Sequence, residues 1–203
     1  MMKHTVKKFA RTLLLAAAVA IAGATTAPVL APDHLFQAHA QQPQPYTSNE
    51  LLNTGHKFFG ATSSGLASLI ERAVSRYGQP NGYVLGEEAS GAIIGGLRYG
   101  EGTLFTKNAG DHKVYWQGPS IGWDFGGDGN RTMMLVYNLT NTDKIHRRYI
   151  GVSGSAYLVG GLGMTVLKHG DTILVPVRTG VGARLGVNVG YLKVRDEPTW
   201  NPF

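Results

Sequence analysis

Hydrophobic residues follow a helical period in one early stretch of the chain. Spacing of i, i+3, i+4 and i+7 is typical of a helix that buries one face. Gly78 and Pro80 end the pattern, because both residue types interrupt helices. We therefore expect a helix from Ser63 or Ser64 to Tyr77. Its buried face should consist of Leu66, Leu69, Ile70, Ala73, Val74 and Tyr77.

A second helix is expected immediately before this one. Thr47 precedes Glu50 by three residues, which is the spacing of a capping box. In this motif each side chain accepts a hydrogen bond from the other residue's backbone N–H. The helix should therefore begin near Ser48. Gly55 and Gly60 should weaken or interrupt it, because glycine is a poor helix former. Together the two helices form an expected helical segment over residues 48–80.

Beyond Tyr83 the hydrophobic pattern changes to a period of two, which is typical of strands with one buried face. The expected strands lie at 102–107, 112–117, 121–125, 132–139, 155–168, 172–178 and 183–191. Seven or eight antiparallel strands rich in glycine predict a mainly β fold, a small closed or nearly closed barrel over residues 81–203. An open sandwich is the alternative. Residues 143–149 are expected to form a short helix or loop with a basic cluster.

Residues 1–40 have the features of a secretory signal peptide. A basic start is followed by an apolar run at 13–24 that is too short to span a bilayer, and Ala38-His39-Ala40 offers a cleavage site. Cleavage after Ala24 or Ala27 is the alternative. We expect an exported mature chain without a transmembrane span, beginning with a Gln/Pro-rich linker at residues 41–47.

Removing this leader changes the charge of the chain. The whole sequence has a net charge of +6, but the leader contains four of the 19 Lys and Arg and one of the 13 Asp and Glu. A net charge of about +3 remains, with one dense basic cluster at residues 144–148. A nucleic-acid binder would show a more concentrated basic face, so nucleic acid is not an expected partner. The chain has no cysteine, so its core alone must stabilise it.

Catalytic motifs are weak in this sequence. Glu101, Asp124 and Asp128 have no pattern that would fix the separation of two catalytic carboxylates, and acidic residues beside glycine usually form turns. Ser153 and Ser155 lack the spacing of a nucleophile elbow. The glycine-rich segment 180–186 precedes an alternating strand rather than a helix, which argues against a dinucleotide. We expect neither an enzymatic activity nor a cofactor.

Metal binding is not expected either. The histidines of the mature chain, His56, His112, His146 and His169, are isolated from one another, and cysteine is absent. Together with the polar residues near it, Asp124 supplies too few oxygen donors for a calcium-binding loop.

Binding is the function class that the sequence favours. Between Gly91 and Asn130, glycines alternate with aromatic residues, a combination typical of tightly coiled β-structure. Large rings beside basic groups suit a glycan, or a lipid with an anionic head group. The alternative is that the rings fill the barrel core. The candidate ligand-binding residues are Tyr99, Tyr115, Trp116, Trp123, Arg131, Arg147 and Arg148.

Several long motifs resemble the envelope integrity protein A (EipA) family of Gram-negative periplasmic proteins. The resemblance extends from about Ser64 to the last residue. The segments that carry it are 95–104, 113–120, 126–129, 131–139, 160–163, 178–192 and 199–203. A weaker likeness to lipid-binding domains of the SYLF type is confined to residues 89–136.

This resemblance implies a small periplasmic β-barrel with an N-terminal helical segment, associated with envelope integrity and without a defined enzymatic reaction. The SYLF likeness favours lipid as the ligand. We therefore expect a non-enzymatic periplasmic protein that binds lipid, lipopolysaccharide or an envelope glycan. A structural or interaction module that docks on an envelope protein partner is the alternative.

Overall fold

The computed structural model describes residues 44–60, 64–91, 97–119, 130–179, 190–199 and 201. Within them lie two α-helices and one short 3₁₀ helix: α1 (Ser48–Phe59), α2 (Ser64–Tyr77) and η1 (Thr142–Ile145). The strands are β1 (Gly82–Gly91), β2 (Leu97–Thr106), β3 (Gly110–Pro119), β4 (Asn130–Tyr137), β5 (Arg148–Gly151), β6 (Tyr157–Val159), β7 (Leu162–Met164), β8 (Leu167–His169), β9 (Thr172–Arg178) and β10 (Tyr191–Arg195).

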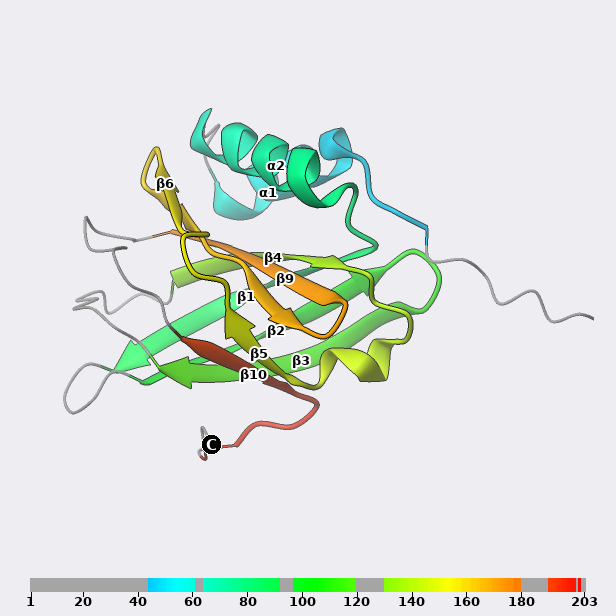
Figure 1. Cartoon of the computed structure of the whole chain (residues 1–203), viewed down its shortest axis with the longest axis vertical. Coiled ribbons are helices and arrows are strands. Elements are labelled where there is room, and N and C mark those ends of the chain that lie inside the picture. Colours follow the sequence, from blue (N-terminus) through cyan, green and yellow to red (C-terminus); the bar gives the residue numbers. More distant parts are fainter. Residues whose placement is uncertain are drawn as a thin grey trace, which may run out of the picture. The chain divides into compact units, whose positions relative to one another are not determined.

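Eight of these strands form a closed antiparallel barrel. Its strand order is β4-β1-β2-β3-β10-β5-β8-β9, and the pairing of β4 with β9 closes the circle. β7 and β6 continue the sheet from β9 as two extra strands, and both α-helices lie beside β4 and β9 (Figure 1). The expected mainly β fold with a small barrel is confirmed, and the sandwich alternative is wrong.

Alternation along the strands separates an inner and an outer face of the barrel. Side chains of one parity fill the interior as a continuous apolar cluster, which includes Val84, Leu104, Met134 and Leu174. Side chains of the other parity on β4 and β9 pack outward against the helices. Strands β4 and β9 are therefore buried on both faces, which explains their nearly unbroken hydrophobic sequences.

The capping box positions α1 as expected. The backbone N–H of Thr47 donates to Glu50 Oε2 at 2.7 Å, and that of Glu50 donates to Thr47 Oγ1 at 3.3 Å. Gly60 ends the helix with a φ of 76°, a conformation that favours glycine. Gly55 lies inside the helix, where a Cβ atom would approach Leu66 Cδ2 to 2.6 Å. This glycine therefore allows α1 and α2 to pack closely.

Glu50 also ties α1 to the turn between β2 and β3. Lys107 Nζ lies 2.9 Å from its carboxylate, and the hydrogen bonds from Lys107 and Thr47 lower the pKa of Glu50 from 4.5 to about 2. A lowered pKa means that the charged carboxylate stabilises the fold above pH 4.5, and that this stabilisation is lost as the pH falls towards 2. Glu50→Gln should therefore lower Tm at pH 7 but have no effect near pH 2.

Thermal unfolding of both proteins from pH 7 to pH 2 measures this difference. Thr47→Ala is the matched variant, because it removes the uncharged half of the same motif and should cost about 1 kcal/mol. An effect of Glu50→Gln that is equally large at pH 2 would contradict the assignment.

Several strands differ from the sequence-based prediction. Residues 155–168, expected as one strand, form three short ones, because Gly160 and Gly161 have positive φ values and turn the chain between β6 and β7. The sequence pattern predicted that strands begin beyond Tyr83, but it did not give bounds for β1. Residues 143–149 divide between η1 and the beginning of β5. The expected strand at 121–125 lies outside the described residues. Of the expected strand at 183–191, only residues 190 and 191 are described, and Tyr191 begins β10, which continues to Arg195.

Candidate functional site

The register of the strands aligns several candidate residues on the outer face of the barrel. Tyr99 on β2 pairs with Gln117 on β3, which pairs with Lys193 on β10, which in turn pairs with Arg148 on β5. All four side chains point outward, because their neighbours along the chain, such as Trp116, Leu192 and Tyr149, belong to the interior cluster. An aromatic ring and two cations that are far apart in the sequence therefore share one row.

A second outward row lies beside the first. Arg131 on β4 pairs with Glu87 on β1, Glu87 with Glu101 on β2, Glu101 with Tyr115 on β3, and Tyr115 with Arg195 on β10. Cations thus stand at both ends of this row and two carboxylates lie between them. We call the two rows together the outer binding face.

A pocket of about 540 Å³ opens on this face between β1–β3 and the C-terminal tail. Tyr99, Tyr115, Glu101 and Gln117 contribute to one side of it, and Pro198 and Thr199 to the other. The tail is held by Gln117, whose Nε2 donates to the carbonyl oxygen of Asn201 at 2.7 Å.

This pocket combines ring faces with hydrogen-bonding groups. Tyrosine rings present apolar surfaces with a polar edge, and carboxylate oxygens accept hydrogen bonds from hydroxyl groups. The combination is suited to sugars, whose rings have both apolar C–H faces and hydroxyl groups.

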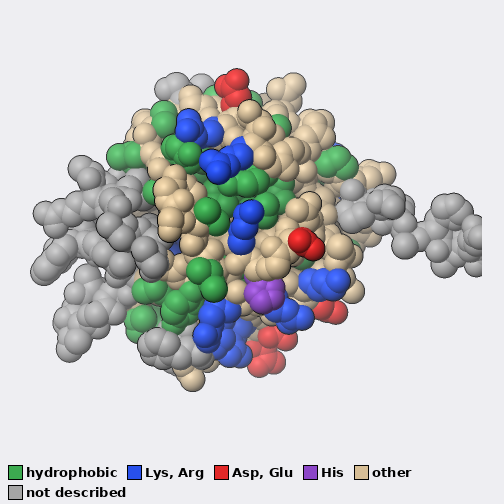
Figure 2. Space-filling model, in the orientation of Figure 1, with side chains coloured by type: hydrophobic (Ala, Val, Ile, Leu, Met, Phe, Trp, Pro, Cys, Tyr) green, Lys and Arg blue, Asp and Glu red, His purple; other side chains and the backbone are tan. Residues whose placement is uncertain are grey.

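The β10 side of the outer binding face is positively charged. Burial lowers the pKa of Lys193, and the charges of Arg195 and Arg148 lower it further. The guanidinium carbon of Arg148 also lies 5.2 Å from the ring centre of Tyr191. In the lower part of Figure 2, where β5, β10 and η1 lie, lysine and arginine side chains occur together with acidic side chains. Cations that repel one another gain from a nearby anion, so this end favours a negatively charged partner.

Trp116 lies in the barrel interior and is 2% exposed. Its Nε1 donates to Glu88 Oε2 at 2.8 Å, and its indole ring covers Gly100 so closely that a Cβ atom there would overlap Nε1, Cε2 and Cζ2. The ring therefore fills the core, as the alternative interpretation expected, and Trp116 is also among the residues that line the pocket.

Arg131 lies at the β4 end of the second row, where it donates from Nη1 to the carbonyl oxygen of Phe58 at 2.9 Å and so contacts the end of α1. Arg147 is outside the two rows: it is exposed, precedes β5, and donates to the carbonyl oxygen of His146 at 3.0 Å. Trp123 lies outside the described residues. The strand register therefore brings four predicted residues onto the outer binding face: Tyr99, Tyr115, Arg131 and Arg148.

Sequence reasoning missed Lys193, Arg195 and Gln117 as members of this face. The spacing of Tyr191, Lys193 and Arg195 is a detectable signal, because alternate residues of a strand point to the same side. Their proximity to Arg148 and Tyr115 depends on pairing between distant strands, which the sequence pattern does not reveal.

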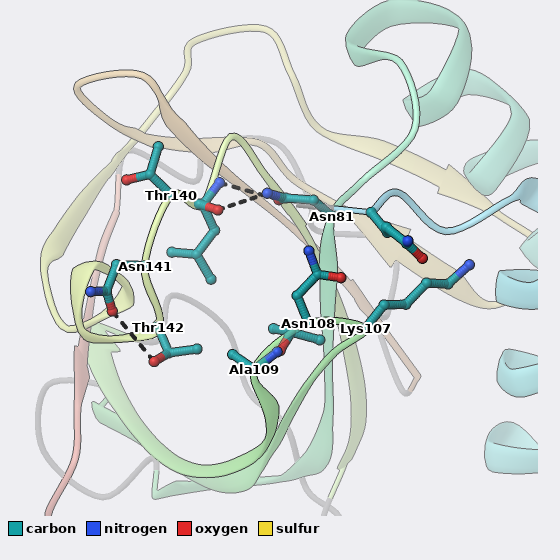
Figure 3. A pocket seen from close by; sticks show the side chains of 10 residues that line it. Asn81, Lys107, Asn108, Ala109, Thr140, Asn141 and Thr142 are labelled. Carbon is teal, nitrogen blue, oxygen red and sulfur yellow. Dashed lines mark hydrogen bonds between the residues drawn. The ribbon is translucent and has the colours of Figure 1, made fainter. Parts of the chain in front are cut away.

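A second pocket of about 300 Å³ lies near the turn between β2 and β3 (Figure 3). Residues Thr140 to Thr142 face the Lys107–Ala109 turn across it. Asn81 donates from Nδ2 to the carbonyl oxygen of Leu139 at 2.7 Å and accepts from its N–H at 3.2 Å, while Asn141 caps η1. These amides stabilise local turns, so we assign no ligand to this pocket.

The described residues contain no group of three or more His, Cys, Asp or Glu residues arranged to hold a metal ion. None of their helices is long and apolar enough to cross a membrane.

Comparison with known proteins identifies relatives of this fold. The family model described as Envelope integrity protein A matches residues 44–203. A crystal structure of a beta-barrel-like, uncharacterized protein from Brucella abortus has 64% sequence identity and a TM-score of 0.73, and the match covers 78% of this chain and 99% of that chain. No curated protein matches. Because the family model covers most of the sequence, this chain belongs to the envelope integrity protein A family.

Proposed function

We propose that this protein supports the cell envelope without catalysing a reaction, by binding lipopolysaccharide or a related envelope lipid or glycan at the outer binding face. Family membership indicates a role in envelope integrity. The ligand assignment rests on one observation: a tyrosine-lined pocket and a positively charged strip occupy neighbouring positions on one sheet.

The chemistry of the two parts is complementary. Tyr99 and Tyr115 offer ring surfaces for a sugar, and Glu101 offers an acceptor for its hydroxyl groups. Lys193, beside Arg148, offers positive charge to a phosphate or carboxylate. Lipopolysaccharide contains sugars and anionic groups in one molecule, so it would engage both parts together.

The proposed location is the periplasm. The basic start, short apolar run and Ala38-His39-Ala40 of the first forty residues support export by a cleaved signal peptide. A periplasmic protein would meet lipopolysaccharide and other glycans of the envelope directly.

Substitutions on the outer binding face should weaken binding to purified lipopolysaccharide. Tyr115→Ala removes one ring of the pocket, and Lys193→Glu reverses a charge in the strip, so each should raise Kd by about tenfold. The effect of Lys193→Glu should shrink at high salt, because salt screens exposed charges. Isothermal titration at two salt concentrations measures both effects.

Arg76→Glu is the matched control, because it makes the same charge reversal on an exposed position of α2, away from this face. Failure of the unmodified protein to bind lipopolysaccharide, envelope phospholipid vesicles or glycan fragments would overturn the ligand assignment. Crosslinking in intact cells tests the alternative, docking on an envelope protein: trapping of one defined protein through Tyr115 or Lys193 would favour that alternative.

A further inference from the structure

A charged cluster lies at inward-facing positions of the barrel, and its carboxylate, Glu88, also lines the pocket of the outer binding face. Arg98, Glu88 and Thr132 are 7%, 5% and 0% exposed, and the side chain of Arg178 is 11% exposed. Each side chain lies at a position of its strand that points into the barrel. On the same strands, the inward-pointing positions further along form the apolar interior, which includes Leu104 and Val84. The polar groups therefore occupy one end of the same interior.

The hydrogen-bonding capacity of this cluster is incompletely used. Glu88 Oε2 accepts from Trp116 at 2.8 Å, and Glu88 Oε1 lies 3.5 Å from Arg178 Nε, which is an ion pair without hydrogen-bond geometry. Among the buried side-chain atoms of the described residues, Arg98 Nε, Arg178 Nε and Nη2, and Thr132 Oγ1 have no hydrogen-bond partner. Buried donors without partners are costly, so several N–H groups here require an acceptor.

The charges of the cluster do not balance. Among the described residues, the cluster contains two guanidinium groups and one carboxylate, so these side chains together carry one net positive charge. Burial lowers the pKa of Arg98 to about 10, and the nearby Arg178 contributes in the same direction, against the opposite effect of Glu88. The guanidinium group nevertheless stays charged at neutral pH. A negatively charged acceptor would satisfy both the charge and the free N–H groups.

Arg98 and Arg178 enter the interior from strands that are not neighbours. Arg98 lies on β2, where it pairs with Gly118 of β3, and Arg178 lies on β9, where it pairs with Thr132 of β4. A Cβ atom on Gly118 would overlap the carbonyl oxygen of Tyr191, but it would make only an ordinary contact with Arg98 Nε, at 3.6 Å. Gly100, two residues further along β2, is covered by Trp116.

We propose that the inner end of the barrel binds a small oxyanion, a phosphate or carboxylate group, between Arg98 and Arg178. Arginine donors in a planar fork match two oxygens of such a group, and Thr132 supplies a further hydroxyl. Glu88 reduces the attraction and orients Arg178. The anion belongs either to a free small molecule or to the head group of a lipid. Glu88 also lines the pocket of the outer binding face, whereas Arg98, Arg178 and Thr132 do not.

Binding of inorganic phosphate and of acetate to the purified protein tests the site, with chloride at equal ionic strength as the reference. Phosphate should raise Tm in a concentration-dependent way, because a ligand that binds only the folded state stabilises it. Arg98→Met and Arg178→Met should each weaken phosphate binding by about tenfold or more, since each removes charged hydrogen-bond donors. Without phosphate their Tm should be unchanged or higher, because an apolar chain replaces a poorly paired buried charge.

Glu88→Gln should have the opposite effect on phosphate binding to the two arginine substitutions. The amide oxygen can still accept from Trp116, but the net charge of the cluster rises from one to two positive charges, so phosphate should bind about tenfold more tightly. A purely structural role of Glu88 would not produce this gain. Arg147→Met, an exposed arginine before β5, should leave phosphate binding unchanged.

Short-chain phosphatidic acid distinguishes the two sources of the anion. Tighter binding than inorganic phosphate would assign the site to a lipid head group, and binding of inorganic phosphate or acetate alone would assign it to a free anion. If none of these compounds raises Tm beyond chloride, or if Arg98→Met and Arg178→Met respond to phosphate like the unmodified protein and the Arg147→Met control, the proposal is wrong.

Discussion

Gly100→Ala is expected to destabilise the protein by about 3 kcal/mol or more, which corresponds to a decrease in Tm of roughly 6–12 °C. The indole of Trp116 lies directly on Gly100, and a Cβ atom at this position would overlap three atoms of the ring. The ring cannot move away easily, because its Nε1 is hydrogen-bonded to Glu88 and it is packed in the barrel core. Urea denaturation of both proteins measures the loss.

Two further variants isolate the cause. Gly190→Ala is the control, because a Cβ atom there would make only an ordinary contact with Pro119, at 3.7 Å. Combining Gly100→Ala with Trp116→Leu should cost less than the sum of the single substitutions, since the smaller side chain leaves space for the added methyl group. Strict additivity would show that the clash with the indole is not the source of the loss.

Glu88→Ala is expected to cost about 3–5 kcal/mol, because it removes the carboxylate that forms an ion pair with the buried Arg178 and opposes the charge of the buried Arg98. It also leaves the Trp116 N–H without its acceptor. Among the described residues of the cluster, the two arginines would then have no carboxylate to oppose their charges. Thermal and urea unfolding at neutral pH should both detect the loss.

The adjacent carboxylate offers a matched control. Glu87 lies on the same strand but faces outward and is exposed, so Glu87→Ala should change stability by less than about 0.5 kcal/mol. Glu88→Gln keeps an acceptor for Trp116 and should retain a larger part of the stability than Glu88→Ala. Equal losses from Glu87→Ala and Glu88→Ala would contradict the importance of the buried position.

Both positions belong to a barrel that uses its two faces differently. The inner face contains the apolar core and, at one end, the charged cluster of Glu88, Arg98, Thr132 and Arg178. The outer face presents the tyrosine-lined pocket and the positively charged strip. Consecutive residues such as Glu87 and Glu88, or Tyr115 and Trp116, therefore have opposite environments.

Elements specified by short-range interactions were predictable from the sequence. The Thr47 and Glu50 motif places the start of α1, because both partners are three residues apart. The spacing from Leu66 to Tyr77 predicts α2 for the same reason. Alternation also predicts a β-barrel, since many short glycine-rich strands leave no exposed edge only when the sheet closes.

The orientation of the aromatic residues was only partly predictable. Tyr115 and Trp116 are neighbours in one strand, so period two already requires that only one of the two side chains face outward. Which of them does so depends on the space available inside. Gly100 and Gly86 provide that space for Trp116, and they belong to β2 and β1 rather than to β3.

The sequence by itself determined the two helices, the barrel class and the family likeness, because each depends on local spacing or on motifs within continuous segments. Only the tertiary structure decided that Tyr99 shares a row with Lys193 and Arg148, and that Arg98 and Arg178 are both buried at inward-facing positions of the barrel. These contacts depend on the pairing register of strands that are distant in the chain. A shift of one residue in that register would exchange the inner and outer faces.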